Sequence, residues 1–477
     1  RVWFGILAFG EMLGVTLYHH WWGDHYAFGK FHFHYTGFHW VHPLPDPWMS
    51  LYLLTLWVAA WCIILGYRYR FFSLYFAVGF TYTFLLEKSY YLNHGYLFCV
   101  FSFLMALLPA HRAFSRDVLR RPSIRLRSIP RISLLPLPLG MGIVYFFGGI
   151  AKLNGDWLRG IPMLQWLQRR GTNPLDHFFW LEHLGLGKVV HYLDEKASDL
   201  MQADWLAHFL SIGGTAFDLF IPLLLLHRRT RLAAFFIVLF FHFTNFLIFN
   251  IGIFPFLSIG LTALFFPADF PRRLIRRLAR RFRWVRGRVL AWLRRLRRRT
   301  HYWRTARLEY SRTRQNLLMV ALALYILYHV CMPLRHWLYP GDVAWTEEGH
   351  RFAWRMMLRS KQGYGHFVLK DPVQGIRKKV VPREHLTRRQ AYKMPGQPDM
   401  IHEFAQQLAS HYRQVEGWDS VEVYAHIKTR LNYGPYIPFT DTTVNLAATP
   451  WKPFGHATWI LPLPEDYQTS TTSNNPD

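Results

Sequence analysis

Long blocks of apolar residues occupy much of the first 333 positions and constrain the fold more than any other feature. A membrane-spanning helix needs about 20 mostly apolar residues to cross about 30 Å of hydrocarbon, whereas a soluble amphipathic element places its apolar residues in periodic stripes. Hydrophobic residues make up 51% of the chain, and their grouping in blocks favours a membrane protein over two or three soluble domains. Nine spans are predicted: residues 2–20, 48–66, 71–87, 95–110, 133–151, 205–226, 232–250, 253–267 and 317–333.

The net charge of +27 would suggest a nucleic-acid partner in a soluble protein, but its distribution favours a membrane surface. Between Pro271 and Arg314 there are 18 arginines and a single acid, Glu309. Apolar residues recur every three or four positions among them, which predicts a basic amphipathic helix or helix pair on an anionic leaflet. An RNA-binding arm uses similar chemistry, but no nucleic-acid-binding fold signature accompanies it. Anionic lipids are therefore the predicted partner, and nucleic acid is not.

Arginine-rich loops predict the orientation of the spans. Basic loops belong to the cytoplasmic side, and the loops at 67–70, 111–131 and 227–231 share a side with the arginine-rich run if all nine spans cross. The loops at 21–47, 88–94 and 152–204, together with everything after residue 333, then lie outside. We therefore expect a multi-pass integral membrane protein, in the inner membrane if the source is bacterial.

Beyond the ninth span the pattern becomes that of a small soluble domain. Residues 365–372, 376–382 and 420–431 read as strands, and residues 398–415 read as an amphipathic helix. The predicted fold class is an α-helical membrane protein of about nine spans with a small C-terminal extracytoplasmic α+β domain. The predicted divisions are a transmembrane core at 1–267, a cytoplasmic polybasic segment at 268–315, a ninth span at 316–333, the extracytoplasmic domain at 334–465 and a disordered tail at 466–477.

An apolar segment runs directly into Lys152 in the stretch VYFFGGIAKLNGDW, residues 144–157. Removal from water disfavours the ammonium form of a lysine, and a desolvated lysine can act as a base near neutral pH. Alternatively, Lys152 extends from a helix end to the lipid headgroups, with Asp156 as its solvated neighbour. The stretch by itself leaves both interpretations open.

Polar residues also lie inside the sixth and seventh predicted spans. Asp218 falls in the sixth, and His242, Thr244 and Asn245 fall in the seventh. Ionisable groups in a span are costly, so they usually face the bundle interior and pair or line a polar path. Interhelical hydrogen bonds that fix packing are the alternative explanation.

Histidines are frequent in the first outer loop, which suggests either a metal site or an aromatic belt. His32 and His34 alternate with Phe31 and Phe33, which places both histidines on one face of an extended segment. No companion carboxylate or thiolate set completes a ligand shell. An interfacial belt of aromatic residues with polar tips is therefore favoured, and no metal is expected.

Several motifs together resemble the vitamin K-dependent gamma-glutamyl carboxylases. The active-site lysine motif of that family is matched by Lys152, Leu153, Asp156 and Trp157. Ala151 and Asn154 depart from it, since animal members carry a second lysine and an acid there. The resemblance continues in the same order through residues 86–97, 217–226, 240–254 and 352–357. The chain is similar to a short, bacterial-type member.

The resemblance implies roles for individual residues. Lys152 corresponds to the base, His94 with Asn93 orients and stabilises oxyanions on the quinone, and His242 is a further polar contact. Asp156 holds the loop or helps to poise the lysine, and Asn245 supports the site. The segment FAWRMM carries Arg355 where the family has an acid, and three of its residues either contact the quinone ring or pack the domain against the bundle: Trp354, Met356 and Met357.

The implied reaction couples oxidation of reduced vitamin K, phylloquinol or menaquinol, by O₂ to carboxylation of glutamyl residues with CO₂, which is the chemistry of a carbon–carbon lyase. The lysine deprotonates the quinol, and the strong base formed during epoxidation removes a proton from the γ-carbon. The implied partners are the lipid bilayer and a glutamate-containing peptide or protein. Two alternatives remain: a quinol epoxidase with another or no carboxylation substrate, and a non-catalytic maturation or binding protein on the same scaffold.

Overall fold

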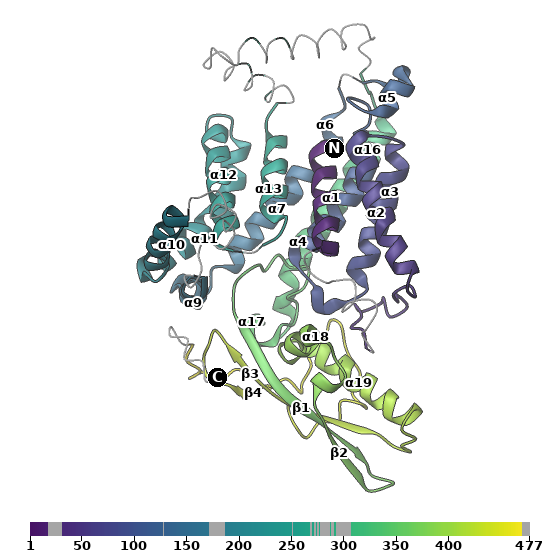
Figure 1. Cartoon of the computed structure of the whole chain (residues 1–477), viewed down its shortest axis with the longest axis vertical. Coiled ribbons are helices and arrows are strands. Elements are labelled where there is room, and N and C mark those ends of the chain that lie inside the picture. The colour runs from purple at the N-terminus through teal and green to yellow at the C-terminus, as the bar shows by residue number, and fades with distance from the viewer. Residues whose placement is uncertain are drawn as a thin grey trace.

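The computed structural model is mostly helical and carries a small sheet near the C-terminus (Figure 1). It describes residues 1–17, 31–126, 128–170, 187–249, 251–267 and 307–469, with five single positions between 270 and 291. The helices form a bundle, and the sheet lies beyond one end of it. Most of the predicted polybasic segment at 268–315 lies outside the described residues, and the predicted disordered tail does so from residue 470 onward.

Helices occupy all nine predicted spans within the described chain. They are α1 (Val2–Leu17), α2 (Trp48–Leu65), α3 (Tyr69–Leu85), α4 (Asn93–Leu107), α7 (Pro136–Ala151), α11 (Asp204–Leu226), α12 (Arg231–Ile248), α13 (Phe254–Thr262) and α16 (Arg312–Leu334). Four described helices are long and apolar enough to cross a membrane: Trp48–Leu65, Asp204–Leu226, Arg231–Ile248 and Arg312–Leu338. Membrane crossing by all nine helices stays a prediction, and these four satisfy its length and composition requirements.

The remaining α-helices lie between these elements or after α16. Those in the first part of the chain are α5 (Arg116–Arg120), α6 (Arg131–Leu134), α8 (Gly155–Leu158), α9 (Ile161–Arg170) and α10 (Gly187–Met201). Those in the last part are α17 (Val343–Thr346), α18 (Arg388–Lys393) and α19 (Pro398–Gln414). The amphipathic helices α9 and α10 lie in the predicted outer loop 152–204, beside the start of α11 (Figure 1).

Small residues allow the helices of the bundle to approach closely. A Cβ at Gly149 of α7 would lie 2.7 Å from Leu219 Cγ of α11, and a Cβ at Gly5 of α1 would lie 2.7 Å from Ile64 Cγ1 of α2. Larger residues would force these pairs apart, as expected where van der Waals packing joins membrane helices. The close approach at Gly149 brings the end of α7 against α11.

The outer surface of the bundle is apolar. Phe236, Phe240 and Phe243 on α12 are more than half exposed, whereas Ala234 and Val238 on the opposite face of that helix are buried. A soluble monomer rarely exposes so many large apolar side chains together. The arrangement therefore fits helices whose outer faces contact lipid.

The C-terminal region is an antiparallel sheet packed against α19. The strands are β1 (Lys361–Asp371), β2 (Ile376–Val380), β3 (Glu422–Leu431) and β4 (Ile437–Pro438), in the order β2-β1-β3-β4. Phe367 pairs with Val380 on one side and with Ala425 on the other. Phe404 of α19 packs on this face, edge-on to Phe367 at a centroid distance of 5.1 Å. The predicted helix and strands of this domain are confirmed.

Two predicted basic loops meet at the end of the bundle away from the sheet (Figure 1). The Arg1 guanidinium donates to the carbonyl oxygens of Ile63 and Phe114, each at 2.6 Å. The Asp117 carboxylate accepts from the backbone N–H of Arg68 at 2.8 Å. The loops at 67–70 and 111–131 therefore share one end of the bundle, as the charge pattern predicts.

Cysteine labelling tests the orientation of this arrangement. In a variant whose three native cysteines are replaced by alanine, we expect Val373→Cys, between β1 and β2, to react with a membrane-impermeant maleimide in intact cells. Leu119→Cys in α5 should react only after permeabilisation, because its loop is basic. Leu119 and Val373 are 72% and 70% exposed, so access alone does not distinguish them. The reverse labelling pattern would invert the predicted topology.

Candidate active site

A buried ion pair lies where α7 ends against α11. The Nζ of Lys152, the residue that follows α7, contacts the Oδ2 of Asp218 on α11. Lys152 is 8% exposed and Asp218 is 5% exposed, so water solvates neither group well. A buried charge needs a partner of opposite sign. Each of these two side chains supplies that partner for the other.

Trp157 fixes the position of the lysine loop. Its indole Nε1 donates to the carbonyl oxygen of Ser211 and to the hydroxyl of Thr215, both at 3.0 Å. Lys152 Nζ lies 5.5 Å from the centroid of its ring, within the range of a cation–π interaction. Asn154 caps α8 by accepting from the Trp157 N–H at 3.0 Å. The lysine motif thus positions an ammonium between a carboxylate and an aromatic face.

Asp156 faces the C-terminal domain and not the lysine. Its Oδ2 accepts from Asn432 Nδ2 at 2.7 Å, and its Oδ1 accepts from Thr469 Oγ1 at 3.1 Å. Arg159 is also paired with Oδ1, at 2.7 Å. Of the two expectations for Asp156, these contacts favour a role in holding the loop, while Asp218 is the carboxylate beside Lys152.

Asn93 and His94 begin α4, and Asn93 contacts the segment 352–357. The Asn93 Nδ2 donates to the carbonyl oxygen of Arg355 at 3.1 Å, and its Oδ1 accepts from the Tyr91 hydroxyl at 2.9 Å. His94 lies against Gly252, where a Cβ would be 3.4 Å from His94 Nε2. Gly252 has φ +58°, so glycine suits both its backbone conformation and the close approach of the imidazole.

His242 is fully buried on α12. Its Nε2 lies 2.7 Å from the hydroxyl of Tyr145 on α7, and its Nδ1 has no hydrogen-bond partner among the described residues. Asn245 lies one turn further along α12, half-buried, and its carbonyl oxygen accepts from Phe249 N–H at 2.8 Å. Tyr145 lies about two turns of α7 before Lys152. His242, which contacts Tyr145, therefore lies further from the end of α7 than the Lys152–Asp218 pair does.

The segment 352–357 enters the bundle in a strained conformation. Phe352, Trp354 and Met357 have φ values of 61°, 57° and 47°, in the left-handed region that side chains other than glycine disfavour. Trp354 is 1% exposed and stacks on the rings of Tyr96 and His329, at centroid distances of 5.1 Å and 5.7 Å.

Met356 brings this segment to the ion pair. A Cβ atom added at Gly148 would lie 3.8 Å from Met356 Cε and 3.2 Å from Asp218 Oδ2. The segment therefore contacts Asn93 through the Arg355 carbonyl and approaches the Lys152–Asp218 pair through Met356. Met357 lies at the edge of the segment and is 37% exposed. No interaction between described residues joins His94 or His242 directly to Lys152.

A cavity of about 250 Å³ lies beside this cluster, at the junction between bundle and domain. Tyr328, Phe352, Arg351 and His350 are among its lining residues, but Lys152, Asp218 and His94 are not. Burial lowers the pKa of Arg355, near this junction, to about 10, so its guanidinium stays protonated at neutral pH. The cavity therefore borders Phe352, at the start of the segment 352–357, and is not lined by the Lys152–Asp218 pair or by His94.

Two family models match the chain on either side of the polybasic segment. The HTTM domain matches residues 1–270, and the vitamin K-dependent gamma-carboxylase lumenal domain matches residues 314–466. The chain belongs to the vitamin K-dependent gamma-carboxylase family. No solved structure matches this carboxylase-family chain. The residues around Lys152 come from both matched regions, because Met356 and Trp354 follow residue 314.

Sequence reasoning about this carboxylase-family protein left Asp218 out of the site. An acid inside a span predicts a buried partner, and a lysine at the end of another span is a suitable one. The separation of 66 residues between Lys152 and Asp218 hides the pair until α7 packs on α11. The sequence showed an acid within one span and a lysine at the end of another, but it did not show that the two form a pair.

Paired substitutions test whether the ion pair exists in the membrane protein. Asp218→Leu should leave the ammonium of Lys152 buried without a partner and cost about 3–5 kcal/mol of stability. The double variant Lys152→Met with Asp218→Leu should recover most of the loss, because neither charge remains. Thermal unfolding of the purified protein in detergent measures both.

A surface pair supplies the control. Lys196 and Asp199 on α10 lie 3.7 Å apart with more than half of each side chain exposed, and exposed pairs contribute little. Asp199→Leu should therefore change the unfolding temperature little. Equal destabilisation in the Asp218 single and double variants would show that the two buried charges do not interact.

Proposed function

We propose that this protein is a vitamin K-dependent carboxylase-like membrane enzyme. It would oxidise reduced vitamin K with O₂ to the epoxide and use the resulting base to carboxylate glutamyl residues of a peptide with CO₂. The observation that carries the proposal is the buried Lys152, held against Asp218 in a chain that both family models match. The bilayer and anionic lipids are the proposed surroundings, with the C-terminal domain on the extracytoplasmic side and the bacterial inner membrane as the location.

Buried donors suit the oxygen atoms of a reduced naphthoquinone. Trp354 Nε1 and His242 Nδ1 are buried and have no hydrogen-bond partner among the described residues, and a buried polar atom without a partner is costly. The rings of Tyr96 and Trp354 offer an aromatic surface, and Met356 an adaptable apolar contact. When bound, reduced vitamin K supplies an acidic hydroxyl and the oxidation that drives carboxylation.

The ion pair prepares Lys152 to act as a base. An ammonium cannot accept a proton, so Lys152 Nζ must first lose one. Asp218 Oδ2 is the atom in contact with Nζ and can take that proton, which leaves a neutral amine beside a neutral acid. Because the pocket is poor in water, the loss of two opposite charges is less costly there than in solution. The amine then accepts the quinol proton.

The experiment that tests the function scores two products separately. Purified protein is incubated with reduced vitamin K, O₂, isotopically labelled CO₂ and a glutamyl peptide. Epoxide and labelled peptide together support the proposal. Epoxide without label would indicate a quinol epoxidase with another substrate, and neither product would favour a non-catalytic protein on this scaffold.

Substitution of Lys152 tests the base directly. Lys152→Ala should abolish epoxidation and carboxylation together, because the strong base is never formed. Lys152→Arg should fail equally, since a guanidinium stays protonated and cannot accept the proton. Small exogenous amines should restore part of the activity of Lys152→Ala, with a pH dependence that follows the free amine. A fully active Lys152→Arg enzyme would leave only an ion-pairing role with Asp218 for this residue.

Substitution of His94 tests a donor near the reacting oxygen atoms. His94→Ala should fold and purify normally but lose epoxidation by about 10²–10³-fold, the effect typical of removing an oxyanion donor. His208→Ala is the matched control, because His208 is an exposed histidine on α11. Near-normal turnover in the His94 variant would assign this residue to the interfacial belt.

A further inference from the structure

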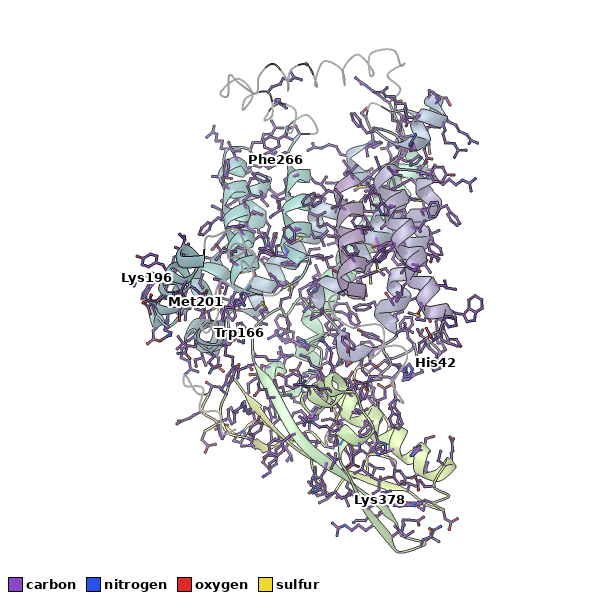
Figure 2. All side chains as sticks on the ribbon, in the orientation of Figure 1. His42, Trp166, Lys196, Met201, Phe266 and Lys378 are labelled. Carbon is purple, nitrogen blue, oxygen red and sulfur yellow. The ribbon has the colours of Figure 1, made fainter. Side chains whose placement is uncertain are left out.

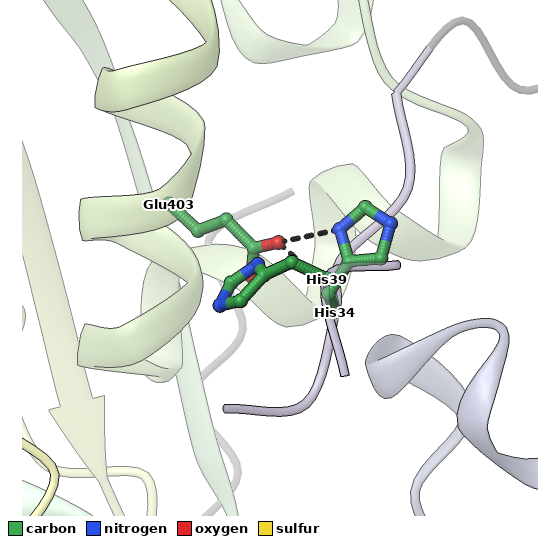
Figure 3. Close-up of side chains that lie close together, drawn as sticks. All are labelled: His34, His39 and Glu403. Atoms are coloured by element: carbon green, nitrogen blue, oxygen red, sulfur yellow. Dashed lines mark hydrogen bonds and ion pairs between the residues drawn. The ribbon is translucent and has the colours of Figure 1, made fainter. Parts of the chain in front are cut away.

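Three potential metal ligands meet where the loop after α1 crosses α19 (Figure 3). His34 and His39 come from the loop, and Glu403 comes from α19; one ligand atom from each lies within 4.8 Å of the other two. The Nδ1 of His34 is 3.0 Å from Glu403 Oε1, and the ring centroids of His34 and His39 are 5.6 Å apart. Glu403 lies 369 positions from His34 in the sequence, so local sequence patterns do not connect the two.

The backbone around His34 is held in place before any ion binds. Its N–H donates to Glu403 Oε1 at 2.7 Å. Three neighbouring backbone carbonyl oxygens also accept hydrogen bonds. The Phe33 oxygen accepts from Lys88 N–H at 2.8 Å. The Phe31 and His32 oxygens accept from the side-chain amides of Gln390 and Gln407, at 2.9 Å and 2.7 Å. A preorganised first ligand lowers the cost of assembling a metal site.

The electrostatics of the cluster also suit a cation. His34 and Glu403 side chains are each 12% exposed, and His34 Nε2 is buried with no hydrogen-bond partner among the described residues. Lys88 occupies the other carboxylate oxygen, Oε2, at 2.9 Å, so Oε1 faces the histidines as an anionic ligand.

We propose that His34, His39 and Glu403 bind one divalent transition-metal ion of the zinc class. Imidazole nitrogen with a carboxylate oxygen is a zinc ligand set, whereas calcium and magnesium prefer oxygen ligands alone. Zinc bonds of about 2.0–2.2 Å bring tetrahedral ligand atoms within about 3.5 Å of one another. The exposed His39 needs only a small side-chain movement to reach that spacing.

The ion would fasten the first outer loop to the C-terminal domain. The fourth position is open to water or to His42, whose ring centroid lies 5.3 Å from that of His34; Figure 2 shows His42 beside this junction. The cluster contains no residue of the proposed active site, so this inference does not depend on the proposed function. It departs from the expectation, drawn from the sequence, that no metal is bound.

Zinc binding to the full-length protein tests the proposal without any activity assay. The protein carries a purification tag free of histidine, is stripped with a chelator and is titrated with ZnCl₂ against a chromophoric competitor. Native protein should bind one more equivalent of zinc than Glu403→Gln. Any zinc that the variant still binds at this site should be held at least tenfold more weakly. His39→Ala should lose the same equivalent; because His39 is exposed, its loss cannot be attributed to unfolding. Cobalt in place of zinc should give the absorption of a tetrahedral site.

The control is His411→Gln, since His411 lies on the same helix, two turns beyond Glu403, and outside the cluster. This variant should bind like the native protein. Zinc should also raise the unfolding temperature of the native protein and the His411 variant, but not that of His39→Ala. Equal binding by native protein, Glu403→Gln and His39→Ala would overturn the proposed site, as would loss of binding in the His411 variant alone.

Discussion

The contact between Lys152 and Asp218 is the interaction on which the rest of the bundle depends. Two charges can stay buried among apolar helices only if each finds the other, and that requires α7 and α11 to touch. Gly149 removes the side chain that would separate them, and Trp157 anchors the loop that carries the lysine. The requirement for a paired charge thus explains small and aromatic residues whose roles seem unrelated in the sequence.

Much of the fold could be predicted because its determinants are local. Apolar blocks locate the nine helices, and alternation along 420–431 locates β3. The segment 352–357 contacts Asn93 through Arg355 and approaches Asp218 through Met356; the functional roles of these residues stay predictions. Helix length was less predictable, since only four described helices reach the length and apolarity of a full span.

The interactions that could not be predicted join residues far apart in the chain. Asp218 was visible as a polar residue in a span, but nothing in its neighbourhood named Lys152 as its partner. Glu403 read as one polar position of an amphipathic helix, and only the packing of α19 on the first outer loop shows it beside His34. Pairwise choice among distant polar groups is set by the tertiary structure, which local patterns do not encode.

The left-handed backbone at Phe352, Trp354 and Met357 has a consequence for how such proteins can diverge. Each such residue costs about 1–3 kcal/mol, which only a well-fitted surrounding can offset. That surrounding is divided between the two matched family regions, since Tyr96 belongs to the first and Trp354 to the second. Recombination between residues 270 and 314 would combine the bundle of one protein with the C-terminal domain of another. The segment 352–357 of that domain would then meet bundle residues that do not fit its conformation. Residues of one region at this contact therefore constrain which residues the other region can carry there.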